Sequence, residues 1–141
     1  MKNLILASAS PRREKILKRL NMQFTVVPSK VDESVYEHLT PEKMVQELSA
    51  LKAKEVSKLV EDTLIIAADT IIVNEQKVLG KPESEEAAIK MLKELRGKNH
   101  TVITGLSVFS TLDNKEITDI DRTEVYLANM TDNEVEKYVS T

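Results

Sequence analysis

The stretch Thr63-Leu64-Ile65-Ile66-Ala67-Ala68-Asp69-Thr70-Ile71-Ile72-Val73 is the most apolar part of this 141-residue chain. Continuous apolar character over this length predicts a central strand that is covered on both faces. Asp69 interrupts the stretch, and an unpaired carboxylate buried in such a strand is costly. We therefore expect Asp69 to lie at a break or at the end of the strand, facing a cation or solvent. The alternative is a side chain that only satisfies neighbouring backbone N–H groups, but the depletion of acids in strands favours a functional carboxylate.

The segments on either side of this strand predict an α/β fold. Helical periodicity, proline starts and capping residues predict helices at 11–20, 41–59, 84–96 and from 131 onward. Short apolar or β-branched runs predict strands at 3–7, 23–27, 100–109 and 116–128. The last two strands form a predicted hairpin around 112–115, whose second arm is rich in charge. We expect that arm to be an exposed edge or a dimer edge.

Composition excludes several classes of function. The net charge is −3 at pH 7, which argues against a general nucleic-acid binder and requires any anion site to be local. The chain has no cysteine, so disulfides, thiol catalysis and thiolate metal sites are excluded. Three glycines are too few for a Gly-rich phosphate cradle. No apolar segment approaches membrane length, and a cytoplasmic protein is the default expectation.

A second polar motif, Ser8-Ala9-Ser10-Pro11-Arg12-Arg13, lies between the first predicted strand and the first predicted helix. Helix N-termini attract phosphate, Pro11 suits the first helical position, and arginine can bind two phosphate oxygens at once. The motif is therefore a candidate anion-binding turn. On composition alone, a capping Ser10 followed by solvated arginines is an equally good interpretation.

Two lysines are weaker candidates when each is taken alone. Lys81 lies in Gly80-Lys81-Pro82, just before a predicted helix, and so repeats the pattern of a basic residue beside a helix entrance. Lys52 lies near the middle of a predicted helix, where most lysines are solvated.

Four short motifs together resemble the Maf family of nucleoside triphosphate pyrophosphatases. They are Ser8-Ala9-Ser10-Pro11-Arg12-Arg13, Val31-Asp32-Glu33, Ala68-Asp69-Thr70 and Gly80-Lys81-Pro82. Each motif is weak alone, but the four occur in order and span nearly all of the chain. The resemblance implies a mixed, twisted sheet flanked by helices, in an elongated α/β molecule with a central cleft, similar to inosine-triphosphate pyrophosphatases.

The resemblance also implies an activity and a site. The expected reaction is hydrolysis of a nucleoside triphosphate to the monophosphate and pyrophosphate, with Mg²⁺ or Mn²⁺ as the metal. Asp69 resembles the family's proton acceptor, and Glu33 and Asp69 its metal ligands. Residues that match its substrate-binding positions are Ser8, Arg12, Arg13, Lys52, Thr70 and Lys81. The pairing of Arg12 with Thr70 is similar to the branch that acts on dTTP, UTP and related pyrimidine nucleotides.

Two further expectations follow from the family pattern. Members usually continue beyond the position of Thr141, so residues 1–141 are expected to form a single Maf-like domain that is C-terminally incomplete relative to the family. Homodimers are a family habit, which makes a second copy of the chain an expected partner. The alternative function is a non-catalytic nucleotide-binding regulatory module linked to cell division and septum formation.

Overall fold

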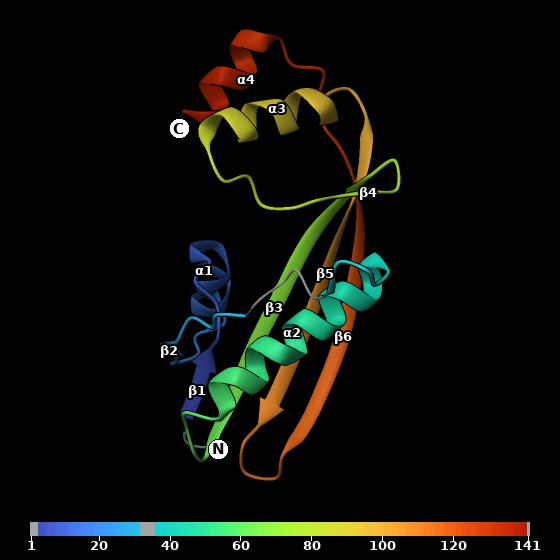
Figure 1. The fold of residues 1–141 in the computed structure, drawn as a ribbon. Coiled ribbons are helices and arrows are strands. Elements are labelled where there is room, and N and C mark those ends of the chain that lie inside the picture. The colour runs from blue at the N-terminus through green and yellow to red at the C-terminus, as the bar shows by residue number, and fades with distance from the viewer. Residues whose placement is uncertain (1–2, 32–35, 141) are drawn as a thin grey trace. The chain divides into compact units, whose positions relative to one another are not determined.

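The computed structural model describes residues 3–31 and 36–140. Apart from the short strand β4, which was not predicted, its elements follow the expected order along the chain (Figure 1). They are β1 (Asn3–Leu6), α1 (Pro11–Arg19), β2 (Thr25–Val26), α2 (Pro41–Ser57), β3 (Thr63–Asn74), β4 (Lys77–Leu79), α3 (Glu85–Leu95), β5 (Asn99–Ser110), β6 (Lys115–Tyr126) and α4 (Asp132–Val139). The predicted α/β class is confirmed, although β2 is shorter than the strand expected at 23–27.

The strands form one mixed sheet in the order β2-β1-β3-β5-β6, with β4 paired to β3. Strand β1 runs parallel to both β2 and β3, whereas β4 is antiparallel to β3. The apolar stretch at 63–73 is therefore the central strand, as predicted. Strand β6 is mostly exposed and lies at the end of the sheet order, which confirms the expected exposed arm of the hairpin.

The chain divides into two compact units, and the division on β3 falls directly after Thr70. Unit 1 contains residues 1–70 and 104–121, and unit 2 contains residues 71–103 and 122–141.

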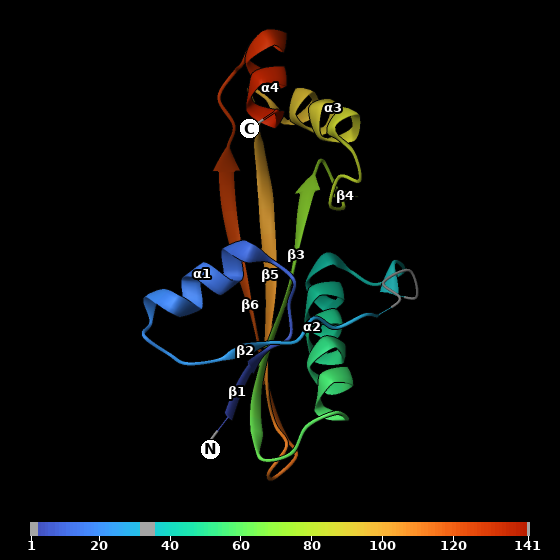
Figure 2. The same ribbon diagram turned by 90° about the vertical axis from the view of Figure 1, so that its left-hand side faces the viewer.

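Unit 1 is a sheet with a helix on each face. Figure 2 shows α1 and α2 on opposite sides of β1 and β3. A buried apolar cluster joins α2 to three strands and contains Ile5, Ala7, Ala53, Val56, Ile65, Ala67 and Phe109. Because side chains alternate along a strand, Ile65 and Ala67 place the odd-numbered residues of β3 on the α2 side.

Helix α2 comes unusually close to β5 at Gly105. A Cβ built at Gly105 would overlap the carbonyl oxygen of Val45 and lie 2.5 Å from its carbonyl carbon. Any side chain at position 105 would therefore have to push α2 away by about 1 Å to reach ordinary van der Waals contact. An isolated glycine within a strand often marks such a close backbone approach.

Unit 2 is held by packing between α3 and α4 and by side-chain caps. Ser84 caps α3, and Thr131 with Glu134 forms a capping box at the predicted start of α4. Arg96, at the end of α3, donates from Nη1 to Asp132 Oδ1 at 2.5 Å and to the Met130 carbonyl oxygen at 3.2 Å. These contacts attach the start of α4 to the end of α3.

Candidate active site

Asp69 lies within β3, six residues after its start and five before its end. The expectation that it lies at a break or at the end of the strand is therefore wrong, whereas the expectation that it faces a cation is confirmed. Lys52 Nζ of α2 donates to Asp69 Oδ1 at 2.9 Å. The Lys52 and Asp69 side chains are only 15% and 9% exposed. Pairing with a lysine reduces the cost of burying the carboxylate, so the backbone ladder does not have to break.

The local fold explains why Lys52 reaches Asp69. Lys52 directly precedes Ala53, which is fully buried in the core beneath α2. It also lies seven residues, or two helical turns, after Val45, whose backbone rests against Gly105. Asp69 belongs to the odd-numbered side of β3 that faces α2. The close approach at Gly105 thus places the face of α2 that carries Lys52 against β3, the strand that carries Asp69.

The turn between β1 and α1 lies beside the same part of β3. The backbone N–H of Ala7 donates to the carbonyl of Ile66 at 2.8 Å, so that Ser8 follows alongside Ala68. Ser10 caps α1 by accepting from the backbone N–H of Arg13 at 3.4 Å. The capping interpretation of Ser10 is therefore confirmed.

Arg13 is not part of a solvated face. Its Nη1 donates to Ser8 Oγ and to the carbonyl oxygen of Ala68, both at 3.0 Å, and its Nη2 donates to Thr70 Oγ1 at 3.1 Å. Burial lowers the pKa of Arg13, the negative charge of Asp69 opposes this shift, and the positive charge of Arg12 adds to it. Arg13 thus connects the segment after β1 to the middle of β3. Its positive charge also interacts with the negative charge of Asp69.

Asp69 and Thr70 present different chemistry on opposite faces of β3. Asp69 pairs with Lys52 on the α2 side. Thr70 faces the other side, where its Oγ1 accepts from Arg13 and lies 3.1 Å from the Oγ1 of Thr104 on β5. On one face of β3, Asp69 therefore forms a buried ion pair with Lys52. On the other face, the hydroxyl of Thr70 contacts both Arg13 and the hydroxyl of Thr104.

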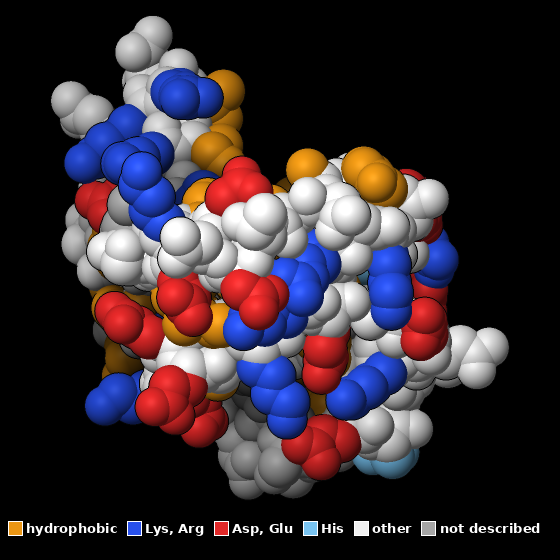
Figure 3. Space-filling view, turned by 90° about the horizontal axis from the view of Figure 1, so that it is seen from above, with side chains coloured by type: hydrophobic (Ala, Val, Ile, Leu, Met, Phe, Trp, Pro, Cys, Tyr) orange, Lys and Arg blue, Asp and Glu red, His pale blue; other side chains and the backbone are white. Residues whose placement is uncertain are grey.

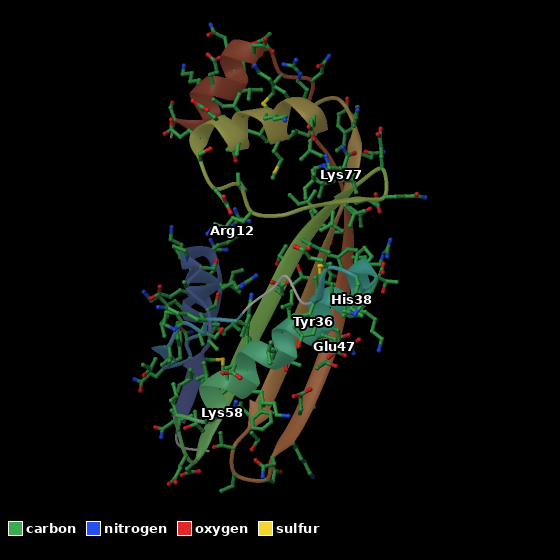
Figure 4. The ribbon with its side chains drawn as sticks, viewed as in Figure 1. Arg12, Tyr36, His38, Glu47, Lys58 and Lys77 are labelled. Carbon is green, nitrogen blue, oxygen red and sulfur yellow. The ribbon has the colours of Figure 1, made fainter. Side chains whose placement is uncertain are left out.

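The structure brings together five of the residues predicted from the sequence: Ser8, Arg13, Lys52, Asp69 and Thr70, all in unit 1. Arg12 is exposed at the start of α1 (Figure 4). Lys81 is exposed and belongs to unit 2. Glu33 lies outside the described residues.

Asp69 suits a divalent cation such as Mg²⁺ whose remaining ligands come from substrate phosphates and water. Within residues 3–31 and 36–140, no three His, Cys, Asp or Glu side chains cluster to form a metal cage. Mg²⁺ does not require such a cage, because it commonly binds through one or two carboxylates together with substrate phosphates and water. The carboxylate of Asp69 supplies oxygen ligands of the required kind.

Residues 3–141 match the family described as Maf-like protein. The chain belongs to the Maf-like family. The dTTP/UTP pyrophosphatase of Moorella thermoacetica is 45% identical over 141 residues, and that of Caldicellulosiruptor saccharolyticus is 41% identical over 145. In both cases the match covers all of this Maf-like chain and 73% of the relative.

Two solved structures share the fold of this chain at low sequence identity. A nucleoside-triphosphatase described as a dITP/XTP pyrophosphatase from Mycobacterium abscessus matches with a TM-score of 0.57 and 15% identity, over 91% of this chain and 75% of that one. A HAM1 protein from Coxiella burnetii matches with a TM-score of 0.59 and 14% identity, over 92% and 75%. At these identities the likeness concerns the fold alone.

Two observations concern the surface charge and the possibility of a membrane-spanning helix. Basic and acidic side chains are interspersed on the face seen in Figure 3. None of the helices in the described ranges combines the length and the hydropathy needed to cross a bilayer.

Two residues next to the candidate site, Thr104 and Gly105, were not singled out from the sequence. Thr104 is a common residue type within a predicted strand and carries no local signal. Gly105 does carry one, because a lone glycine inside a strand indicates a bulge or a close backbone approach.

Proposed function

We propose that this chain hydrolyses nucleoside triphosphates to the monophosphate and pyrophosphate, with dTTP and UTP as the preferred class. The observation that carries the proposal is the buried Lys52–Asp69 pair, with Arg13 bound to the residues on either side of Asp69. A carboxylate held next to fixed positive charge suits water activation beside a polyanionic substrate. The names of the relatives, which are dTTP/UTP pyrophosphatases, support the same reaction.

Asp69 is the proposed proton acceptor. In the proposed step, a water oxygen forms a bond to the α-phosphorus and its proton passes to an Asp69 carboxylate oxygen. The bond from the α-phosphorus to the bridging oxygen breaks, and its electron pair leaves with pyrophosphate. Lys52 donates to Oδ1, which fixes the orientation of the carboxylate before the substrate arrives.

The cationic residues are the proposed binding groups for the triphosphate. Arg13 uses three of its N–H donors within the protein and so offers a fixed positive charge with donors to spare. Ser8 Oγ accepts from Arg13 and from the backbone N–H of Ser10, which leaves its hydroxyl proton for a phosphate oxygen. Arg12 and Lys81, both exposed, are proposed to contact the rest of the triphosphate.

Asp69 and Glu33 are the proposed ligands for Mg²⁺ or Mn²⁺. When bound, the metal supplies neutralisation of phosphate charge and lowers the pKa of a coordinated water. Arg12 and Thr70 are the proposed selectors of the nucleotide, consistent with the pyrimidine substrates named for the relatives.

Product analysis tests the proposal. The purified chain is incubated with dTTP, UTP, dATP and GTP in the presence of Mg²⁺, and the products are separated by anion-exchange chromatography. The expected products are nucleoside monophosphate and pyrophosphate in equal amounts, formed fastest from dTTP and UTP. Orthophosphate with nucleoside diphosphate as the first products, or tight binding without turnover, would contradict the proposal.

A further inference from the structure

Thr104 of β5 completes a row of hydrogen-bonding groups that begins at Ser8. Arg13 contacts Ser8 and Thr70, and Thr70 in turn contacts Thr104, with heavy-atom distances of 3.0 to 3.1 Å. The row connects β1, α1, β3 and β5 within unit 1. Thr70 is exposed and Thr104 is partly exposed, so a ligand can reach this end of the row.

The position of Thr104 follows from the pairing of β3 with β5. Thr63 and Thr111 exchange hydrogen bonds at one end of the strand pair, and Thr70 meets Thr104 seven residues further along β3 and seven residues back along β5. The strands are therefore antiparallel, and Thr104 stands directly opposite Thr70. Cross-strand neighbours on one face are close enough to fix each other's side chains.

The hydroxyl groups of Thr70 and Thr104 have one proton that is not used in the contacts between Arg13, Thr70 and Thr104. A guanidinium only donates, so Thr70 Oγ1 must accept from Arg13. The two threonine hydroxyls have two protons, and one of them is used between Thr70 and Thr104, whichever residue donates. One hydroxyl proton therefore remains for an outside acceptor, next to the fixed charge of Arg13.

We propose that Thr104 is a positioning residue of the nucleotide site: it fixes the Thr70 hydroxyl, which holds Arg13, and the pair presents one O–H donor to an acceptor oxygen of the substrate. This inference rests on the proposed function. The acceptor is either a phosphate oxygen or a carbonyl oxygen of the pyrimidine ring, because both accept a single hydrogen bond from a hydroxyl.

The test compares three variants of the whole chain. Thr104→Val keeps the shape of the side chain and removes the hydroxyl, and Thr104→Ser keeps the hydroxyl. Thr101→Val is the matched control, because Thr101 lies on the same strand and also loses one side-chain hydrogen bond, that of its Oγ1 to Glu124 at 2.7 Å. KM and kcat for dTTP are measured, together with melting temperature and the Kd of inorganic triphosphate.

The expected result is that Thr104→Val raises KM for dTTP about fivefold with little change in kcat, while Thr104→Ser stays within about twofold of wild type. Thr101→Val should lower the melting temperature as much as Thr104→Val without changing KM. A parallel rise in the Kd of inorganic triphosphate would assign the acceptor to phosphate, whereas an unchanged Kd would assign it to the base.

Three outcomes would overturn the inference: a KM for Thr104→Val equal to that of wild type, equal impairment of Thr104→Ser, or equal impairment of Thr101→Val. Failure of the proposed function has a different signature, because the wild type would then not turn over any nucleotide. Binding of dTTP would still compare Thr104→Val with wild type in that case, and an equal Kd of dTTP for the two would overturn the inference.

Discussion

Two ion pairs, one in each unit, connect elements that are far apart in the sequence. Lys52–Asp69 joins α2 to β3 in unit 1 and is nearly buried, whereas Arg96–Asp132 joins the end of α3 to the start of α4 in unit 2, with Asp132 65% exposed. Water competes freely for the second pair, so it contributes little beyond holding two helix ends together. The first pair carries a desolvation cost that simple stability does not require. The difference supports the proposed chemical role for the buried pair of unit 1, whereas the exposed pair of unit 2 only connects two helix ends.

Replacing the carboxylate of the buried pair should have the largest effect. We expect Asp69→Asn to lower kcat by at least about 100-fold, because an amide cannot accept the proton from water. Steady-state kinetics with dTTP, with circular dichroism to confirm folding, measure this. Glu47→Gln, at an exposed position of α2, is the control for loss of a carboxylate and should retain wild-type kcat. An Asp69→Asn variant with half of the wild-type kcat would contradict the proposed role.

Replacing the lysine of the pair tests whether the buried pair also stabilises unit 1. Lys52→Met should lower the free energy of unfolding by about 3 kcal/mol, since it leaves the buried carboxylate without its lysine contact. Lys58→Met is a matched control at the C-cap of the same helix, where the Lys58 and Glu55 side chains are 64% and 40% exposed. Urea unfolding should show a change of at most about 0.5 kcal/mol for that control. Equal losses for the two variants would remove the distinction between buried and exposed pairs.

The close approach of α2 to β5 can be tested by adding one methyl group. Gly105→Ala places a Cβ against the backbone of Val45 and should cost about 1–3 kcal/mol of stability. It should also lower kcat, because lifting α2 moves Lys52 away from Asp69. Ser107→Ala is the control on the same strand and the same face, where the buried hydroxyl has no hydrogen-bond partner among the described residues. That variant should be at least as stable as wild type, and a harmless Gly105→Ala would show that α2 is free to shift.

The exposed pair of unit 2 should give the smallest effect, and one that depends on pH. The hydrogen bond from Arg96, with a further contribution from Lys93, lowers the pKa of Asp132 below its ordinary value. A carboxylate with a lowered folded-state pKa stabilises the fold above its unfolded pKa, about 3.9 for Asp, and this contribution is lost as the pH falls through the folded value.

Asp132→Asn should therefore lower the melting temperature slightly at neutral pH, and the difference from wild type should shrink below about pH 4. The kcat for dTTP should not change. Glu136→Gln changes the charge of α4 by the same amount and serves as the control. A difference between Asp132→Asn and wild type that is constant down to pH 2 would show that the ion pair is not its source.

The order of most elements and the candidate carboxylate of β3 could be predicted from the sequence, because both depend on local pattern. Apolar continuity marked β3 as central, and the rarity of acids in such strands marked Asp69 as functional. The partners of these residues depend on strand register and helix packing, which local pattern does not contain. For this reason Lys52 looked like an ordinary helical lysine, Asp69 was expected at a strand end, and Thr104 was overlooked. Gly105 had a readable signal, but its meaning became clear only when α2 was placed over it.

The most direct test of the proposed reaction follows the oxygen of the attacking water. The chain is incubated with dTTP and Mg²⁺ in water enriched in ¹⁸O, and the isotope content of both products is measured by mass spectrometry. Attack at the α-phosphorus predicts one ¹⁸O atom in the thymidine monophosphate and none in the pyrophosphate, with label incorporation strongly slowed in Asp69→Asn. Label in the pyrophosphate, or incorporation at the wild-type rate in Asp69→Asn, would contradict the account.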